Sequence, residues 1–125
     1  MPKECKKSIL VVEDNRLNMK LVVDLLGVNG FNVLQAVDGE SAIEIMKTTV
    51  PDLILLDIQL PGIDGFEVLK RIKENKQLDA AKVVALTAQV MREEMERISN
   101  VEFDAYLTKP INTKDFIIKI KTMLL

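Results

Sequence analysis

Five residues with chemically useful side chains each follow or end a short apolar stretch of this sequence. They are three acids, a hydroxyl and an ammonium, namely Glu13, Asp14, Asp57, Thr87 and Lys109. A carboxylate that follows a buried apolar run costs free energy unless a partner needs it there. Carboxylates brought together also repel one another, so these acids predict a cation among them if the fold makes them neighbours.

Ligands that offer only oxygen favour a hard cation, so we expect Mg²⁺ or Mn²⁺ rather than Zn²⁺. In such a site Asp57 is suited to be a nucleophile that forms an aspartyl-phosphate. Lys109 would neutralise oxygens of the phosphoryl group, and Thr87 would donate a hydrogen bond to it. The sequence contains no histidine, which excludes histidine-based acid/base catalysis and histidine metal ligation within the chain.

Alternating apolar and amphipathic stretches predict the elements that position these residues. Four apolar runs predict strands, namely Ile9–Val12, Leu53–Leu56, Val83–Leu86 and Ala105–Leu107. Alternating apolar residues predict a further strand at Phe31–Ala36. Apolar residues at helical spacing predict five helices, within residues 17–26, 38–47, 64–72, 91–99 and 112–124.

Several polar residues mark the expected helix ends. Gly30 is placed to stop the first helix, and Asn15 is placed to cap its start. Asp64, with Glu67 three residues later, predicts a capping box for the third helix. Asn112 is expected to cap the last helix.

A strand followed by a helix, repeated five times, predicts an α/β fold in which a doubly wound parallel sheet has helices on both faces. Right-handed crossovers bring the carboxyl ends of all the strands to one edge of the sheet. Binding sites of open sheets form at that edge, where the strand order switches. We therefore expect the five chemically useful residues to meet there.

Length and composition are those of one ordinary globular domain. The 125 residues are 48% hydrophobic and 29% charged, and we expect a polar leader at residues 1–7 and a folded domain at 8–125. The formal net charge of -2 gives no electrostatic reason to expect nucleic acid or an anionic membrane as partner. The one cysteine, Cys5, cannot form an internal disulfide, which favours a reducing, cytoplasmic location.

Four segments in this order resemble the receiver domain of two-component response regulators, the chemotaxis-regulator fold. They are residues 11–15, 55–65, 85–88 and 106–111, so the resemblance covers essentially the whole chain. Glu13-Asp14-Asn15 with Asn18, and Ile58-Gln59-Leu60-Pro61, are similar to single-domain regulators of the DivK type and to receivers attached to hybrid histidine kinases. The resemblance implies a flavodoxin-like, five-stranded sheet in the order 2-1-3-4-5.

The resemblance also implies a function and a role for each site residue. Asp57 accepts a phosphoryl group from a phosphohistidine on a histidine kinase or a histidine phosphotransfer protein. Asp14, Asp57 and the backbone carbonyl of Gln59 ligate Mg²⁺, and Glu13 helps through water. Lys109 pairs with Asp57 before phosphorylation and with the phosphoryl group afterwards. The domain is thus expected to be a phosphoacceptor signalling switch and not an enzyme. The only reactions expected of it are its own phosphorylation and its own slow dephosphorylation.

In the switch that the resemblance implies, Thr87 moves onto the phosphoryl group and Tyr106 rotates inward into the vacated space. The change is read by a downstream protein at the face built from the fourth helix, fifth strand and fifth helix. The same resemblance implies a cis peptide bond at Pro110 and a small residue, Ala88, that leaves the phosphoryl group room. We expect a monomer or weak dimer.

Two glutamines that flank the expected pocket, Gln59 and Gln89, are predicted to tune hydrolysis by ordering or excluding water. One residue departs from the family pattern: Glu102 stands where the family commonly has a glycine in a turn of positive φ. This departure concerns the output face and leaves the acid, hydroxyl and ammonium set complete.

Simpler roles stand beside the chemical ones. Asp57 could serve a turn, residues 13–15 could cap a helix, and Thr87 could be an ordinary strand residue. Lys109 could be a solvated surface lysine, and Tyr106 could be part of the core. Three further side chains are candidates for packing alone: Met91, Met95 and Phe103.

Competing functions are separated by single residues. A receiver cut from a hybrid kinase or a larger regulator remains an alternative. A Mg²⁺-dependent phosphohydrolase would need a second acid where Gln59 stands. A flavin-binding domain would carry a phosphate loop at residues 13–16, where the acids would repel phosphate. A degenerate receiver would lack part of the acid, threonine and lysine set.

Overall fold

The computed structural model describes residues 7–60, 62–63, 65–87, 103–108 and 111–124 of the chain. Five parallel strands form one sheet in the order β2-β1-β3-β4-β5. They are β1 (Ser8–Val12), β2 (Asn32–Ala36), β3 (Leu53–Asp57), β4 (Lys82–Thr87) and β5 (Ala105–Thr108). The observed order confirms the predicted one, and no helix of the described residues is long and apolar enough to cross a membrane.

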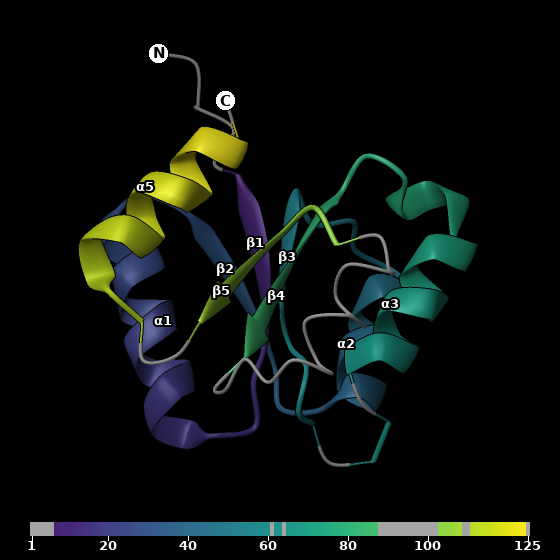
Figure 1. Cartoon of the computed structure of the whole chain (residues 1–125). Helices are drawn as coiled ribbons and strands as arrows, with labels where there is room; N and C mark the ends of the chain where they lie inside the picture. The colour runs from purple at the N-terminus through teal and green to yellow at the C-terminus, as the bar shows by residue number, and fades with distance from the viewer. Residues whose placement is uncertain (1–6, 61, 64, 88–102, 109–110, 125) are drawn as a thin grey trace.

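Helices cover both faces of the sheet. Four are described: α1 (Arg16–Val28), α2 (Gly39–Met46), α3 (Gly65–Glu74) and α5 (Thr113–Met123). Figure 1 shows α1 and α5 on one side of the sheet, with α2 and α3 on the other. A short 3₁₀ turn at Lys76–Leu78 was not predicted, because one turn is too short to show a periodic pattern. The helix predicted within residues 91–99 lies outside the described residues.

The central strands β1 and β3 are almost wholly apolar because both faces of the sheet are buried at its centre, whereas the outer strands β2 and β5 include polar and exposed residues. Along β1, Leu10 and Val12 pack in the cluster with α2 and α3, whereas Ile9 and Val11 pack in the cluster with α1 and α5. Successive side chains of a strand point to opposite faces, so one short run serves two cores. The continuous apolar runs of the sequence therefore correctly indicated a sheet between two helical layers.

Asparagine caps begin two of the helices, as predicted. The side chain of Asn15 accepts a hydrogen bond from the backbone N–H of Asn18 at 3.0 Å, at the start of α1. Asn112 does the same for the N–H of Asp115 at 3.2 Å, at the start of α5. Gly30 follows α1 with a φ of 87°, a conformation that glycine adopts without steric cost. Asp64, the proposed cap of α3, lies outside the described residues.

Candidate functional site

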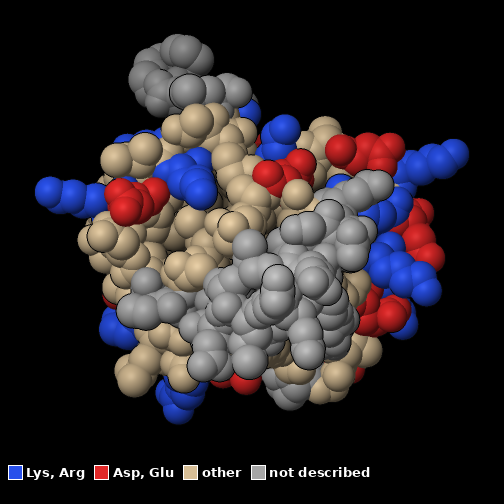
Figure 2. Space-filling view, in the orientation of Figure 1, with Lys and Arg blue, Asp and Glu red and all other residues tan. Residues whose placement is uncertain are grey.

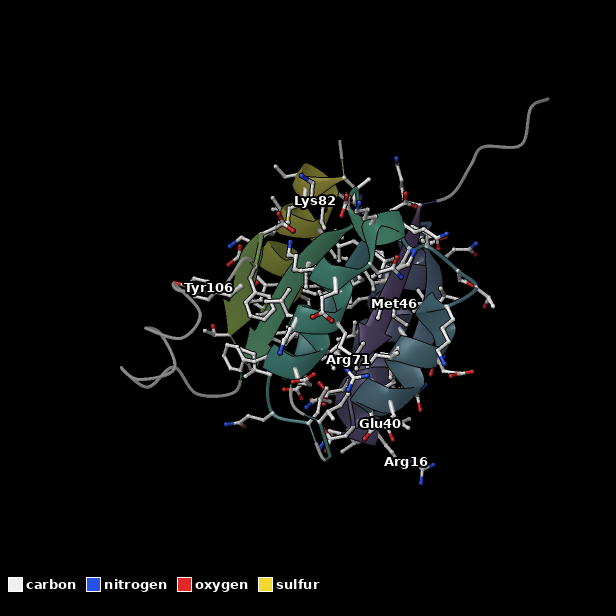
Figure 3. All side chains as sticks on the ribbon, turned by 90° about the vertical axis from the view of Figure 1, so that its right-hand side faces the viewer. Arg16, Glu40, Met46, Arg71, Lys82 and Tyr106 are labelled. Carbon is white, nitrogen blue, oxygen red and sulfur yellow. The ribbon has the colours of Figure 1, made fainter. Side chains whose placement is uncertain are left out.

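The carboxyl ends of the strands meet at one edge of the sheet, which we call the carboxyl edge. Val12 of β1 pairs with Leu56 of β3, so Glu13 and Asp57 are the next positions of two adjacent strands. Figure 3 shows this edge at the lower end of the molecule, where Arg16 and Glu40 lie in the first turns of α1 and α2. Lys82, the first residue of β4, lies at the upper end. The parallel topology thus brings together residues 44 positions apart in the sequence, as predicted.

Three acids form a tight cluster at the carboxyl edge. Each of Glu13, Asp14 and Asp57 offers a carboxylate oxygen, and these atoms all lie within 4.8 Å of one another. Glu13 is 1% exposed and Asp57 is 4% exposed, whereas Asp14 is exposed to solvent. The cluster therefore has two buried members and one that faces water. Charges held this close in a buried setting need a compensating cation.

Backbone N–H groups fix the orientation of the two buried carboxylates. Asp57 Oδ1 accepts a hydrogen bond from the N–H of Gln59 at 2.9 Å. Glu13 Oε2 accepts one from the N–H of Asn15 at 3.1 Å. Asp57 thus also performs the turn role that was weighed for it, and of residues 13–15, weighed as helix caps, Asn15 caps α1. The structural and chemical interpretations of these residues coexist.

Gly65 lets α3 begin against the end of β3. A Cβ atom on Gly65 would lie 2.7 Å from the carbonyl oxygen of Asp57 and 2.7 Å from the Cα of Ile58. Both are backbone atoms, which cannot give way as a flexible side chain can. The N–H of Gly65 also donates to the carbonyl oxygen of Ile58 at 3.0 Å. The segment that carries Asp57 is therefore held by a contact that only glycine allows.

Gly65 lies in the segment 55–65 that carries the family resemblance, but the sequence alone assigned it no role. A glycine at the start of a helix was the available signal, but close backbone approach is visible only once the two elements are placed. Phe103, weighed as a packing residue, is confirmed as one: its ring meets that of Phe66 edge-on at 6.0 Å. These two rings pack on Ile58 and Ala85, next to the acid cluster.

Another acid, Asp38, lies at the same edge after β2 and serves the fold. Its side chain accepts a hydrogen bond from the N–H of Ser41 at 2.8 Å and so caps α2. The backbone hydrogen bond from Ser41, with help from the Ser41 side chain, lowers the pKa of Asp38 below 3.8. A position at the carboxyl edge therefore does not by itself make an acid part of the candidate site.

The donor set of the cluster fits a hard divalent cation. All three groups are carboxylates, and Mg²⁺ is bound in proteins by one or two carboxylates together with waters. Opposite ligands of one octahedral Mg²⁺ lie about 4 Å apart, since each bond is about 2.0–2.1 Å. A cluster whose oxygens lie within 4.8 Å of one another is therefore of a size that would suit one such ion.

The other predicted site residues are placed only in part. Thr87 ends β4 beside Thr108 of β5, and its backbone alone is described. Tyr106 is 40% exposed, so the core role weighed for it is wrong, and Figure 3 shows its side chain pointing away from the sheet. Seven further residues weighed in the sequence analysis lie outside the described residues: Ala88, Gln89, Met91, Met95, Glu102, Lys109 and Pro110.

Comparisons with known proteins agree with this geometry. The family model of the response regulator receiver domain matches residues 9–121. The polar-differentiation response regulator DivK of Brucella ovis is 42% identical over 118 residues, which cover 94% of this chain and 96% of that protein.

Two solved structures share the fold across almost their whole lengths. A putative response regulator from Chloroflexus aurantiacus has a TM-score of 0.90 at 26% identity, covering 96% of this chain and 98% of that one. The receiver domain of a sensor histidine kinase from Pseudomonas aeruginosa has a TM-score of 0.88 at 26% identity, with the same coverage. That second structure holds a magnesium ion coordinated in its active-site cleft.

Proposed function

The chain belongs to the response regulator receiver domain family, and we propose that it is a phosphorylation-dependent switch whose phosphoryl acceptor is Asp57. The observation that carries the proposal is the buried Asp57 carboxylate at the end of β3, within 4.8 Å of the carboxylates of Glu13 and Asp14. A phosphohistidine on a histidine kinase or a phosphotransfer protein would be the donor.

A divalent cation would be held by this chain's own oxygens. We assign direct contacts to Asp14, Asp57 and the backbone carbonyl of Gln59, with Glu13 acting through water. Bound Mg²⁺ or Mn²⁺ would neutralise charge on the phosphoryl oxygens as they approach the acids. The exposure of Asp14 supports this assignment, because incoming water and phosphate need an open side of the cluster.

Asp57 would act as the nucleophile. The ring nitrogen of the donor that does not carry phosphorus would be protonated. One Asp57 carboxylate oxygen would form a bond to phosphorus while the bond from phosphorus to the other imidazole nitrogen breaks, so that the ring leaves as neutral imidazole and an aspartyl-phosphate forms. The hydrogen bond from Gln59 N–H to Oδ1 prevents free rotation of the carboxylate, so the attacking oxygen is presented in a fixed direction. Lys109 would neutralise the transferred group.

The signal would pass from the site through Thr87 and Tyr106. Thr87 would follow the phosphoryl group, and Tyr106 would turn from its outward position into the space that Thr87 leaves. The exposure of Tyr106 supports an outward starting position. Ala88 would leave room for the phosphoryl group, while Gln59 and Gln89 would set how long it survives.

The readout surface would include β5 and α5. A groove of about 480 Å³ runs there, and its lining includes Tyr106, Ile111, Phe116 and Lys119. A concave surface with apolar and polar lining suits a protein segment. Because Tyr106 lies in the lining, a change in its rotamer would change the shape of the groove. A downstream protein that binds here would thereby sense phosphorylation.

Intact-mass spectrometry after incubation with acetyl phosphate and Mg²⁺ tests the proposal. We expect one phosphoryl adduct on the wild type and none on Asp57→Asn or without divalent metal. Asp52→Asn is the matched control, because Asp52 precedes β3 at the opposite end of the strand and should leave labelling intact. A phosphoryl adduct that persists on Asp57→Asn would refute the acceptor assignment.

If the wild type also stays unlabelled, a phosphorylated histidine kinase replaces acetyl phosphate as the donor. Labelling by the kinase that is lost in Asp57→Asn would support the proposal. The absence of labelling from either donor would contradict it and favour a degenerate receiver.

A further inference from the structure

The layer formed by α2 and α3 keeps its apolar side chains inside the molecule. Among the described residues, none of the large hydrophobic side chains that are exposed belongs to α2 or α3. Figure 2 shows Lys and Arg side chains interspersed with Asp and Glu on the right of the molecule, where Figure 1 places α3. The outer surface of this layer is thus of mixed charge, and its apolar contacts are made in the interior.

The first turn of α2 approaches α3 and the segment that precedes it very closely. We call that segment, residues 58–64, the β3–α3 loop. Gly39 is buried, and a Cβ atom there would lie 2.6 Å from Cγ1 of Ile63 and 2.7 Å from Cγ2 of Val68. Real Cβ atoms essentially never come this close to other atoms. Glycine at residue 39 therefore allows α2 to begin directly against the loop and against α3.

The next residue of α2 contacts the same loop. A Cβ atom on Gly62 would lie 2.9 Å from Oε2 of Glu40, so the Glu40 carboxylate lies against this glycine. Gly62 has a φ of 73°, in the left-handed region that favours glycine. Figure 3 shows Glu40 at the lower end of the molecule, where α2 begins. The first turn of α2 therefore contacts the loop at two successive residues, Gly62 and Ile63.

The end of β3 holds the same segment from another side. Gly65 begins α3 so close to β3 that an added Cβ atom would lie 2.7 Å from backbone atoms of Asp57 and Ile58. Between Asp57 and Gly65 lies Gln59, whose N–H donates to Asp57 Oδ1 at 2.9 Å. The loop is thus confined by one glycine contact with β3 and another with α2. A push on Ile63 would therefore displace the backbone around Gln59, because the β3 contact leaves no free space.

We propose that Gly39 is a positioning residue of the phosphoryl site, because its close contact with Ile63 fixes the loop that carries the Gln59 carbonyl. This inference rests on the proposed function, in which that carbonyl is a metal ligand. Gly39 has no side chain to offer a ligand, so its effect would pass entirely through the loop. Groups that orient metal ligands from outside typically change metal affinity about 10–100-fold when they are mutated.

Mg²⁺ titration of the full chain, labelled with ¹⁵N and followed by amide chemical shifts, tests the inference in Gly39→Ala. In the metal-free protein we expect the amide shifts of Gln59 and Ile63 to differ from those of the wild type, since the added methyl group displaces the loop. The Kd for Mg²⁺ should rise about tenfold or more. Labelling by acetyl phosphate at a subsaturating Mg²⁺ concentration should become slower.

Two control variants separate positioning from stability. Ile45→Ala removes a partly buried side chain of the same apolar cluster, six residues further along α2 from Gly39. It should lower the midpoint of urea unfolding but leave the Kd for Mg²⁺ unchanged. Gly27→Ala adds the same methyl group on α1, where nothing lies within 4 Å of it. It should change neither the Kd nor the amide shift of Gln59.

A double-mutant cycle tests the contact itself. Ile63→Ala removes the atoms that a methyl group at residue 39 would meet on the loop, and by itself it should raise the Kd because the loop loses its support. Combined with Gly39→Ala, the two increases in Kd should be less than multiplicative, since residues in contact do not act independently. If Gly39→Ala does not fold, a Kd for Ile63→Ala equal to that of the wild type overturns the inference.

The possible failures are distinguishable. If the wild type binds Mg²⁺ and is labelled, but Gly39→Ala matches its Kd or its Gln59 amide shift, the inference alone is wrong. An increase in Kd for Ile45→Ala as large as that for Gly39→Ala would assign Gly39 to packing alone. A multiplicative cycle would refute transmission through Ile63. A wild type that neither binds Mg²⁺ nor accepts a phosphoryl group would contradict the proposed function, and this inference with it.

Discussion

The two edges of the sheet use acidic residues in opposite ways. At the edge where the strands begin, Asp52 accepts a hydrogen bond from the N–H of Ser8 at 2.7 Å, and Asp104 accepts one from the N–H of Val83 at 2.7 Å. Each stands just before a strand and binds the backbone at the start of the adjacent strand. At the carboxyl edge, three acids instead converge within 4.8 Å of one another.

This contrast shows what distinguishes a structural acid from a site. A single carboxylate can be stabilised by an N–H group of the chain itself, as at Asp52 and Asp104. A cluster of carboxylates concentrates negative charge, and backbone N–H groups do not carry the full positive charge needed to offset it. The acid cluster of the carboxyl edge therefore suits a bound cation, whereas Asp52 and Asp104 at the amino edge are each held by a backbone N–H group.

The largest expected difference between the edges is in the response to metal. A ligand that binds only the folded state, at about 100 times its Kd, should raise the free energy of unfolding by about 2.7 kcal/mol. We expect this gain for the wild type titrated with MgCl₂ during urea unfolding. Asp14→Asn should lose most of the gain, and Asp104→Asn should keep it. Equal gains in both variants would show that the cation binds elsewhere.

Gly65→Ala should disturb the carboxyl edge by about 1–3 kcal/mol, the usual cost of overpacking. The new methyl group would meet the backbone of Asp57 and Ile58 at 2.7 Å. Gly27→Ala is the matched control on α1, where nothing lies within 4 Å of the added atom. It should instead stabilise the protein by about 0.5–1 kcal/mol, since alanine favours helix. Thermal unfolding measures both changes, and a neutral Gly65→Ala would refute the close-contact argument.

At the amino edge, Asp52→Ala and Asp104→Ala should each lower the free energy of unfolding by about 1–2 kcal/mol, because each leaves a strand N–H without its acceptor. Labelling by acetyl phosphate should continue in both variants. The control is Asp24→Ala, which removes an exposed ion pair with Lys20 and should cost no more than about 0.5 kcal/mol. If the amino-edge variants resemble the control in urea unfolding, these acids are not structural.

The smallest effect concerns Asp38, the structural acid of the carboxyl edge. Its pKa is lowered in the folded state by the hydrogen bonds from Ser41. Its contribution to stability is therefore present above the unfolded pKa and is lost as the pH falls through the lowered, folded pKa. Asparagine caps helices without a titrating group. Acidification should therefore lower the free energy of unfolding of the wild type more than that of Asp38→Asn. Urea unfolding between about pH 3 and pH 6 measures it. If the difference in free energy of unfolding between the two proteins does not change with pH, the lowered pKa assigned to Asp38 is wrong.

The sequence by itself determined the order of the described elements and the grouping of three acids at one edge of the sheet. Apolar runs with no polar break indicated strands buried on both faces, and the parallel topology then required Glu13, Asp14 and Asp57 to share an edge. The helix caps could also be predicted from the sequence, because Asn15 and Asn112 accept hydrogen bonds from N–H groups only three residues away. These features depend on residues close in sequence or on a general rule of sheet topology, so they could be predicted without knowledge of the tertiary structure.

Contacts between distant elements were decided only by the tertiary structure. The need for glycine at residue 65 depends on how closely α3 approaches β3. The outward position of Tyr106 depends on β5 lying at the edge of the sheet, and Asp52 and Asp104 find their partners on neighbouring strands. The apolar residues of α1 have helical spacing whether a neighbour covers them or not, so only packing distinguished the buried Val22 and Leu26 from the exposed Leu17 and Val28.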